Sequence, residues 1–436
     1  MFKYIINILL TVITSFYFFP FEFVFLPGIN TKMAMSGLGL VIVGIQMVKK
    51  RNPLIIDKGI FLLSIVAVLI SLVSLLSTTY NGTNDPSFFT YFISVWVWMA
   101  GAYTLTFCLK KVYKYVSVEL VSNYIIVVCV AQCVLALLMS LYPPFSESVD
   151  KVLGGSEAFM GDAGERMHGI GCALDVAGLK FSAVLVMIAF LCVHSTRIFQ
   201  QKYMGGYILA FLIISVVGNM IARTTTVGVV VALLYWIYIS GFVHNIKKYT
   251  FWKWAVGVIV VFVPVLIYFY NNNQMIYENF RFGFEGFFSL WETGKWEVSS
   301  NDILKNMVVF PDNLRTWIIG DGYAVNPSDI HSPYFDPNYV GESYHGYYME
   351  TDIGYLRYIF YFGLAGLGMF IAFFCVAAQV CIKRFPAYRI LFLMFLLLNF
   401  IGWFKVSTDI FLVFALFLCI SKEENVAYSE YVALKE

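Results

Sequence analysis

The sequence predicts an all-α protein that crosses a membrane many times. Of its 436 residues, 60% are hydrophobic and only 13% are charged, and the mean hydropathy is +0.76. A soluble domain carries roughly a quarter charged residues, so this chain lacks the polar surface needed to face water on all sides. The net charge of +2 is spread in short clusters between apolar runs, which gives no indication of a nucleic-acid partner.

Apolar segments of spanning length follow one another along the chain. A helix needs about 17 to 25 residues to cross the hydrocarbon core of a bilayer. The first segment resembles a signal peptide, but no small-residue cleavage site follows it, so we interpret it as an uncleaved helix. The predicted spans are 4–26, 33–48, 59–78, 88–109, 120–142, 173–193, 206–222, 227–243, 255–270, 353–380, 390–404 and 408–420.

The short loops between these spans predict the orientation of the chain. Lys and Arg are enriched in cytoplasmic loops. Fifteen basic residues lie in one set of loops and only five in the other, and the bias alternates from end to end. We therefore expect both termini in the cytoplasm. The five basic residues of the outer set are Lys32, Lys151, Arg166, Arg223 and Lys405.

The spans and loops divide the chain into three parts. Residues 1–270 hold the first nine spans, with an outer loop near 143–171, and residues 353–436 hold the last three spans and a cytoplasmic tail. Between them, residues 271–352 form a large outer loop rich in Gly, Pro, Asn, Asp and aromatic residues. Within it, helix starts are expected at Ser299 and after Asn313, and 321–348 is expected to be irregular. Ordered loops of this length are usually functional.

Several ionisable residues lie where a membrane disfavours them. Such a residue costs several kcal/mol and needs a reason. Arg223 stands between two spans beside Asn219 and three threonines, which favours a functional arginine over one that snorkels to the surface. Arg357 is explained equally well by function or by an interfacial ion pair with Asp352, and Asp352 is the stronger functional candidate.

Three further features complete the set of charged candidates. Asp175 and Lys180, in the sixth span, are expected to form a buried structural pair. Arg166 and His168, with the outer-side arginines above and Arg315, form a set able to converge on an anion. Guanidinium is permanently charged, planar and bidentate, which suits it to phosphate and pyrophosphate. His345 is the remaining titratable candidate near the membrane re-entry.

Three stretches of the sequence, in this order, resemble the O-antigen polymerase and O-antigen ligase superfamily. The first is Glu165–Gly171 and the second is Ala222–Gly228. The third begins at Trp317–Tyr323 and continues to Asp352-Ile353, which nine residues separate from Gly363-Leu-Ala-Gly366. The resemblance covers most of the chain in topology and about forty residues in detail. Asp352 stands where ligases of the superfamily have histidine. This departure favours a polymerase, or else His345 takes over the histidine's role.

The resemblance implies a fold, a location and an activity. It implies a GT-C-like glycosyltransferase in the bacterial inner membrane whose active face is periplasmic. The substrates would be oligosaccharide repeat units on a polyprenyl pyrophosphate such as undecaprenyl pyrophosphate, polymerised into O-antigen, capsule or exopolysaccharide. The reaction would invert the anomeric centre and need no metal or cofactor. A chain-length regulator is an additional expected partner.

The same resemblance gives the candidate residues their roles. Arg223, with Arg166 and Arg315, would stabilise the charge on the departing pyrophosphate. Asp352 or His345 would accept the proton of the attacking hydroxyl. The substrate-binding candidates, which would hold the lipid-linked glycan, are Arg166, His168, Arg315, Arg357 and Tyr344.

Three alternatives remain open at the level of sequence. An O-antigen ligase would transfer finished glycan to a lipid or protein acceptor. A lipid-linked oligosaccharide flippase, or another transporter, would also need cations in a polar cavity but would not need the long outer loop. A structural or regulatory membrane protein would tolerate loss of Arg223 or Asp352.

Overall fold

The computed structural model describes residues 2–50, 57–154, 167–194, 197–245, 249–330, 334–337, 339, 341, 346–423 and 425. The chain folds into two compact units, each built from separate stretches of sequence. Unit 1 comprises Met1–Lys49, Met99–Gly294 and Ala415–Glu436, and unit 2 comprises Lys50–Trp98 and Lys295–Phe414.

Helices make up most of both units. Those of unit 1 are α1 (Phe2–Phe18), α2 (Thr31–Lys50), α5 (Val118–Leu141), α6 (Pro143–Asp150), α8 (Leu174–His194), α9 (Arg197–Ile221), α10 (Thr225–Asn245), α11 (Tyr249–Asn272), α12 (Gln274–Gly283) and α13 (Glu285–Thr293). Those of unit 2 are α3 (Lys58–Asn81), α14 (Ser299–Asn306), α15 (Leu314–Ile318), η1 (Tyr348–Glu350), α16 (Gly354–Arg384), η2 (Pro386–Tyr388) and α17 (Arg389–Gly402). Helices α4 (Tyr91–Tyr113) and α18 (Phe411–Leu418) contribute several residues to both units, and the last residue of α2, Lys50, belongs to unit 2.

The helices confirm that the chain is a membrane protein. Eight of them in the described part of the chain, α2, α3, α4, α5, α8, α9, α11 and α16, are long and apolar enough to cross a bilayer. Three shorter apolar helices correspond to α1, α10 and α17. Each of the twelve predicted segments contains a helix, but the described helices support eight spans by length and composition.

The first and last predicted spans are shorter than the sequence indicated. Helix α1 ends at Phe18, and the chain then forms strands β1 (Glu22–Phe23) and β2 (Leu26–Asn30). These pair with β3 (Leu153–Gly154) in a small antiparallel sheet of order β2-β1-β3. Pro20 cannot donate the backbone hydrogen bond that a continuing helix requires. At the other end, only Phe411–Leu418 of the segment 408–420 is helical.

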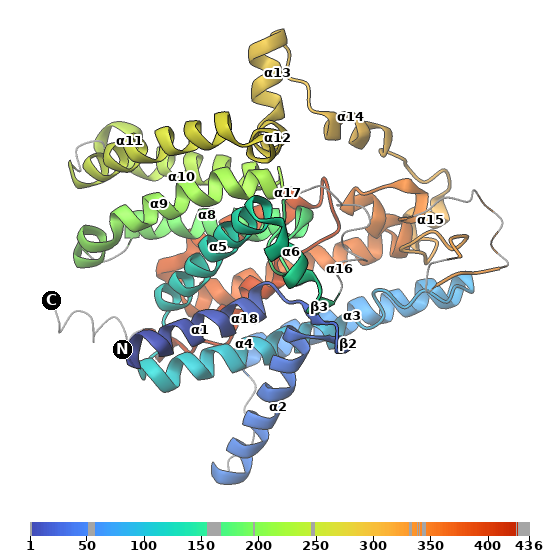
Figure 1. Ribbon diagram of the computed structural model, residues 1–436. Coiled ribbons are helices and arrows are strands. Elements are labelled where there is room, and N and C mark those ends of the chain that lie inside the picture. The colour runs from blue at the N-terminus through green and yellow to red at the C-terminus, as the bar shows by residue number, and fades with distance from the viewer. Residues whose placement is uncertain are drawn as a thin grey trace. The chain divides into compact units, whose positions relative to one another are not determined.

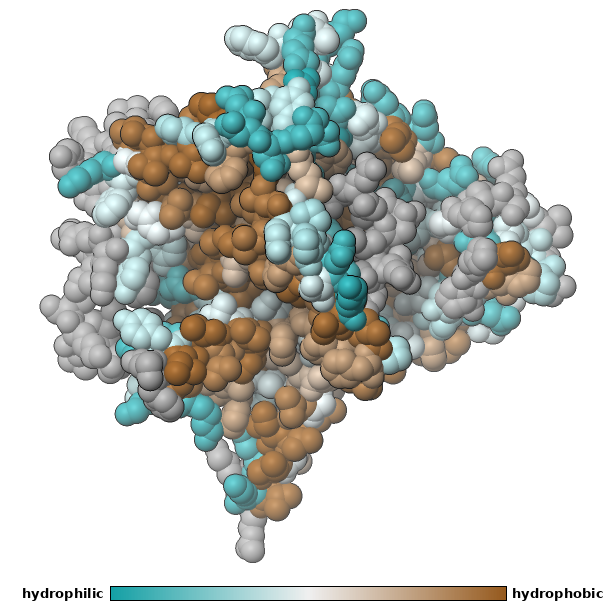
Figure 2. Space-filling view, in the orientation of Figure 1, coloured by the Kyte–Doolittle hydropathy of each residue, from teal (hydrophilic) through white to brown (hydrophobic). Residues whose placement is uncertain are grey.

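Helix α8 is the centre of unit 1. Every residue from Ala177 to Cys192 is buried, as expected for a helix that is apolar on all sides. Its closest neighbour is α10, where a Cβ at Gly228 would collide with Ser182 of α8. Small residues at such a contact let two membrane helices approach closely. In helix α11, in contrast, only 6% of the apolar segment is buried inside the protein, so this helix lies at the edge of the unit. Figure 2 shows the hydrophobic surface over α9, α10 and α11.

Unit 2 is organised around α16, which packs along α3 and against α15 and α17 (Figure 1). The predicted loop helices are confirmed here as α14 and α15, and Asn313 caps α15 by accepting from the backbone N–H of Thr316. The first turns of α16 anchor the loop. Leu356 and Phe360 form a buried cluster there, against which Leu304 of α14 packs.

Candidate functional site

A break in α16 positions the candidate site. The helix loses helical geometry at Phe362 and Gly363, and Gly363 has φ +68° and ψ −171°. This conformation is essentially restricted to glycine. A Cβ at Gly363 would also collide with the carbonyl of Ile318 at the end of α15. Glycine is therefore required at 363 both by the backbone and by the close approach of the loop.

The loop that follows α15 uses the backbone groups around this break. The N–H of Asp321 donates to the carbonyl of Phe360 at 2.6 Å, and the N–H of Gly322 donates to the carbonyl of Tyr361 at 3.0 Å. Gly320, with φ +82°, lies against the backbone of Tyr361, where a Cβ would collide. In a membrane protein, irregular backbone persists only where such partners satisfy its polar groups. Two glycine segments that are about forty residues apart in sequence thus form one contact.

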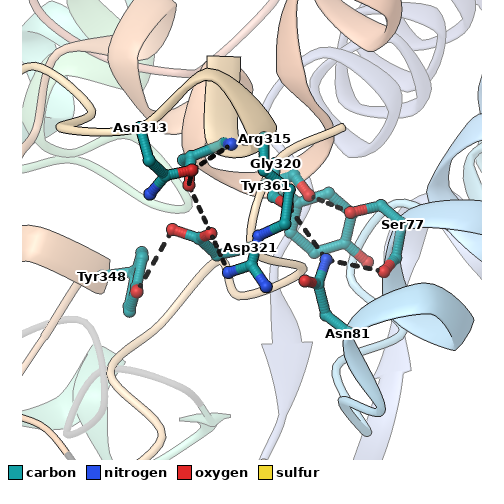
Figure 3. Close-up of polar contacts among 9 residues, drawn as sticks. Ser77, Asn81, Asn313, Arg315, Gly320, Asp321, Tyr348 and Tyr361 are labelled. Carbon is teal, nitrogen blue, oxygen red and sulfur yellow. Dashed lines mark hydrogen bonds and ion pairs between the residues drawn. The ribbon is translucent and has the colours of Figure 1, made fainter. Parts of the chain in front are cut away.

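The end of α3 holds the same loop from another side. Asn81 Nδ2 donates to the carbonyl of Gly320 and to that of Ser77, both at 2.9 Å. Ser77 in turn donates to the carbonyl of Tyr361 at 2.7 Å. Figure 3 shows this chain of hydrogen bonds from α3 through the loop to α16. Since the loop is tied to two helices, the side chain of Asp321 has a defined place.

Asp321 lies in a pocket of about 380 Å³ in unit 2, hereafter the Asp321 pocket. This volume is within the range of small-molecule sites. Its lining combines polar side chains with aromatic rings and comprises Asn81, Phe310, Pro311, Asp312, Asn313, Arg315, Thr316, Asp321, Tyr323, Tyr339, Tyr348, Met349 and Phe360.

Donors converge on the carboxylate of Asp321 (Figure 3). Thr316 Oγ1 donates to Oδ1 at 2.7 Å, and Arg315 Nη2 lies 3.4 Å from the same oxygen. The hydroxyl of Tyr348 donates to Oδ2 at 3.4 Å. The side chain of Arg315 is 55% exposed and that of Asp321 only 16%. The arginine therefore stays available to an incoming anion, while the carboxylate is held in place.

Tyrosine rings form part of the pocket wall. Tyr323 lies 5.7 Å from Tyr339 and 5.4 Å from Tyr348 between ring centroids. Burial, together with Asp336 beside the hydroxyl, raises the pKa of Tyr323 to about 12. Its phenol therefore remains protonated and able to donate at neutral pH.

Strained backbone borders the same pocket. Met349 and Glu350 have φ of +58° and +50°, although neither is glycine. Left-handed conformations of such residues cost about 1–3 kcal/mol each and cluster at functional sites. Met349 lines the pocket directly. The strain lies a few residues before α16, in the segment whose residues Tyr348 and Met349 line the pocket.

Arg223 occupies a second polar site, in unit 1, at the turn between α9 and α10. Its Nη2 lies 2.7 Å from Glu285 Oε2, and its Nε donates to the carbonyl of Phe282 at 2.9 Å. The guanidinium also lies 3.9 Å above the ring of Phe282. With a side chain only 14% exposed, Arg223 does not snorkel freely into water. It joins the turn to α12 and α13.

The expected pairing of Asp175 with Lys180 is wrong. Asp175 instead accepts a hydrogen bond from the hydroxyl of Thr224, the residue next to Arg223. Lys180 is 5% exposed, and its ammonium lies 5.9 and 4.9 Å from the ring centroids of Phe18 and Phe19. The contact between α8 and α10 brings Thr224 to Asp175, whereas Lys180 faces the end of α1. Five residues along a helix separate the two side chains by more than a full turn.

The remaining predicted residues lie in different places. Arg357, in α16, stacks on Tyr347 at 3.3 Å from the ring centroid and is not among the described residues that line the Asp321 pocket. Asp352 is half-buried two residues before α16 and within electrostatic range of Arg357. His168 is half-buried in unit 1. Arg166, Tyr344 and His345 lie outside the described residues.

The predicted set is therefore divided between the units. Arg223 and His168 belong to unit 1, whereas Arg315, Asp352 and Arg357 belong to unit 2. Of the predicted residues, only Arg315 is a described member of the Asp321 pocket.

Sequence reasoning missed the carboxylate of the pocket and the residue that fixes it. Asp321 stands between two glycines, Gly320 and Gly322, which is a turn signal that marks an exposed loop tip as readily as a pocket. Asn81 precedes Gly82 at the end of α3 and reads only as a helix terminus. Neither residue stands out in the sequence. Their importance arises from the contact of the loop with α16, which the sequence does not show.

Comparisons of the chain with protein families, with curated proteins and with solved structures gave no match. Within the described residues, no group of three or more His, Cys, Asp or Glu side chains is arranged to hold a metal ion.

Proposed function

We propose that the protein is a membrane glycosyltransferase that joins oligosaccharide units carried on polyprenyl pyrophosphate, as the polymerases of cell-surface glycans do. The observation that supports this proposal is the Asp321 pocket. It combines a half-exposed arginine, a fixed carboxylate and several tyrosine rings at the ends of two apolar helices.

Each part of the pocket matches one part of such a substrate. The guanidinium of Arg315 suits a pyrophosphate. A sugar ring offers hydroxyl groups to Asp321 and Asn81, and its C–H faces pack on the electron-rich faces of Tyr323 and Tyr348. The apolar surfaces of α3 and α16 are suited to the prenyl chain. A soluble metabolite would not need the last of these features.

The proposed reaction is a single displacement. A hydroxyl oxygen of the acceptor sugar bonds to the anomeric carbon of the donor, and the bond from that carbon to the pyrophosphate oxygen breaks. The electron pair leaves with polyprenyl pyrophosphate, whose negative charge Arg315 stabilises. The hydroxyl proton passes to a carboxylate or imidazole, for which Asp321 joins Asp352 and His345 as a proposal. We further propose a periplasmic active face in a bacterial inner membrane and a GT-C-like architecture.

The test uses charge-removing variants in cells that otherwise lack the protein. Asp321→Asn preserves size, and Arg315→Gln removes the charge but keeps a polar side chain. The first is expected to lower polymer formation about 100-fold, the lower range for loss of an acid–base group. Matched controls are Asp302→Asn and Lys305→Gln. This pair has a 2.7 Å contact in the same loop, but its side chains are 65% and 76% exposed. All variants are compared at equal membrane levels by the length of surface glycan on gels.

Each outcome has a distinct meaning. Loss of long polymer with single units still attached supports a polymerase. Loss of every unit favours a ligase or a flippase. These two are separated by release of polyprenyl pyrophosphate from labelled substrate in nanodiscs, which a flippase does not cause. Ladders that match wild type for Asp321→Asn and Arg315→Gln refute the assignment of the pocket.

A further inference from the structure

Helix α13 of unit 1 turns apolar side chains outward, whereas a helix on the surface of a soluble protein turns polar side chains outward. Phe287, Leu290 and Trp291 recur at the spacing of one helical face, and they are 54%, 49% and 90% exposed. Glu285, at the start of the helix, points instead to Arg223 of the protein. About half or more of each of these side chains is therefore exposed, although exposing an apolar face to water is unfavourable.

This helix is fixed rather than loosely attached. Arg281 of α12 forms two hydrogen bonds of 2.8 Å with the carboxylate of Glu292. Its guanidinium also lies 4.6 Å from the ring centroid of Phe288, which stacks with Tyr270 at the end of α11. The side of α13 that carries Phe288 and Glu292 thus holds it to α12 and α11, and this leaves Phe287, Leu290 and Trp291 facing outward.

The position of α13 identifies the surface that its apolar face meets. Gly283, just before α13, packs against the backbone of Asn219 and Met220, near the end of the candidate span Tyr203–Ile221. Arg223 marks the same level, because it contacts Glu285 from the turn where α9 ends and α10 begins. Helix α13 therefore starts at the depth where the apolar part of α9 stops.

The direction of α13 agrees with this depth. Figure 1 shows it crosswise to α9, α10 and α11 of the same unit and projecting away from them. A helix that starts at the end of a span and runs across the span direction lies along the plane of the lipid headgroups. Amphipathic helices in that plane bury their apolar face at the boundary with the acyl chains, and tryptophan is enriched there.

We propose that α13 is an interfacial membrane anchor whose Phe287–Leu290–Trp291 face inserts into the lipid bilayer at the ends of α9 and α10. The partner is the bilayer surface itself, not another protein. Through Glu285, this anchor fixes the start of α13 beside Arg223, so lipid contact at one end of the helix supports the guanidinium at the other. The proposal depends only on the membrane nature of the chain and stands apart from the proposed catalytic activity.

The test measures the depth of a spin label on each face of α13. The full-length protein is placed in nanodiscs of phosphatidylethanolamine and phosphatidylglycerol, with exposed Cys375 and half-buried Cys108 and Cys419 replaced by Ser. Trp291→Cys carries the label on the apolar face. Thr293→Cys, an exposed position about 160° around the same helix from Trp291, is the matched control.

The proposal predicts opposite accessibility at the two positions. The label at 291 should collide more with oxygen, which partitions into lipid, and that at 293 more with a water-soluble nickel chelate. Transfer of the labelled protein from nanodiscs into a detergent-free aqueous polymer that strips lipid should abolish this difference in accessibility between positions 291 and 293. Equal access of the chelate to both positions would show that the apolar face meets water and would overturn the proposal. Low access of both reagents at 291 would show a protein partner or a second copy there, and would overturn it as well.

Discussion

Replacing Gly363 by alanine is the most direct test of the broken helix on which the Asp321 pocket depends. An alanine at this position must adopt φ +68° and ψ −171°, a conformation that costs about 1–3 kcal/mol outside glycine. It must also displace the carbonyl of Ile318, and overpacking of this kind costs about 1–3 kcal/mol. Together these effects predict a loss of roughly 2–6 kcal/mol in the free energy of unfolding.

The same helix supplies a matched control. Gly368 is also in α16, but a Cβ there would meet no atom within 4 Å. Gly368→Ala should therefore be neutral, or stabilising by about 0.5–1 kcal/mol, because alanine loses less backbone entropy than glycine in a helix. The two variants make the same chemical change, and only their surroundings differ.

Thermal unfolding in detergent, followed by the exposure of buried thiols, provides the measurement. Cys381 of α16 is fully buried and becomes reactive only when the helix packing opens. Gly363→Ala should lower the unfolding midpoint clearly below that of Gly368→Ala. It should also increase proteolysis of the loop before η1, because Asp321 and Gly322 lose their carbonyl partners on α16. Equal midpoints for the two variants would refute the account of the break given above.

Three further predictions concern the surroundings of the two polar sites. Glu350→Gly should raise the free energy of unfolding by about 1 kcal/mol, because glycine adopts the left-handed backbone of this exposed residue without strain. The control variant Glu297→Gly should bring no such gain, and an unchanged unfolding midpoint for Glu350→Gly would contradict the prediction. Folding raises the pKa of Tyr323 to about 12, so its contribution to stability is complete below the unfolded pKa near 10 and is lost as pH rises from about 10 to 12. The Tyr323→Phe variant should therefore lose less stability than the wild type over that pH window. Identical alkaline unfolding curves for the two proteins would count against this prediction. A double-mutant cycle with Arg223→Gln and Glu285→Gln should give a coupling of about 1 kcal/mol, because both side chains are largely buried, and a cycle that gives zero would show that the ion pair does not form.

The membrane character and the positions of the helices were predictable from local sequence. Hydropathy over about 20 residues is a property of the segment itself, and a helix satisfies its own backbone hydrogen bonds in lipid. The start of α14 and the cap of α15 were predictable for the same reason, since Asn313 bonds only three residues ahead. Arg223 could be singled out because an arginine between two spans is costly wherever the chain leads it.

Distant partners decided the features that local sequence did not indicate. The chain after α1 forms strand β1, because β1 pairs with β3 from more than a hundred residues later in the chain. Asp175 bonds Thr224 rather than Lys180, because close packing of α8 on α10 brings a hydroxyl nearer than the next helical turn.

The Asp321 pocket shows the same division most clearly. Its glycines are visible in the sequence, but each is an ordinary turn or helix residue until the loop meets the break in α16. Asp321 then gains a fixed carboxylate because the N–H groups of 321 and 322 bond carbonyls released at that break. Helix formation depends on neighbours in sequence, whereas the place of a side chain in a site depends on which backbone groups far apart in the chain satisfy one another. For this protein, the sequence alone determined a helical membrane protein with ionisable residues between and beside its apolar segments, and the tertiary structure decided which of those charges lies in a pocket.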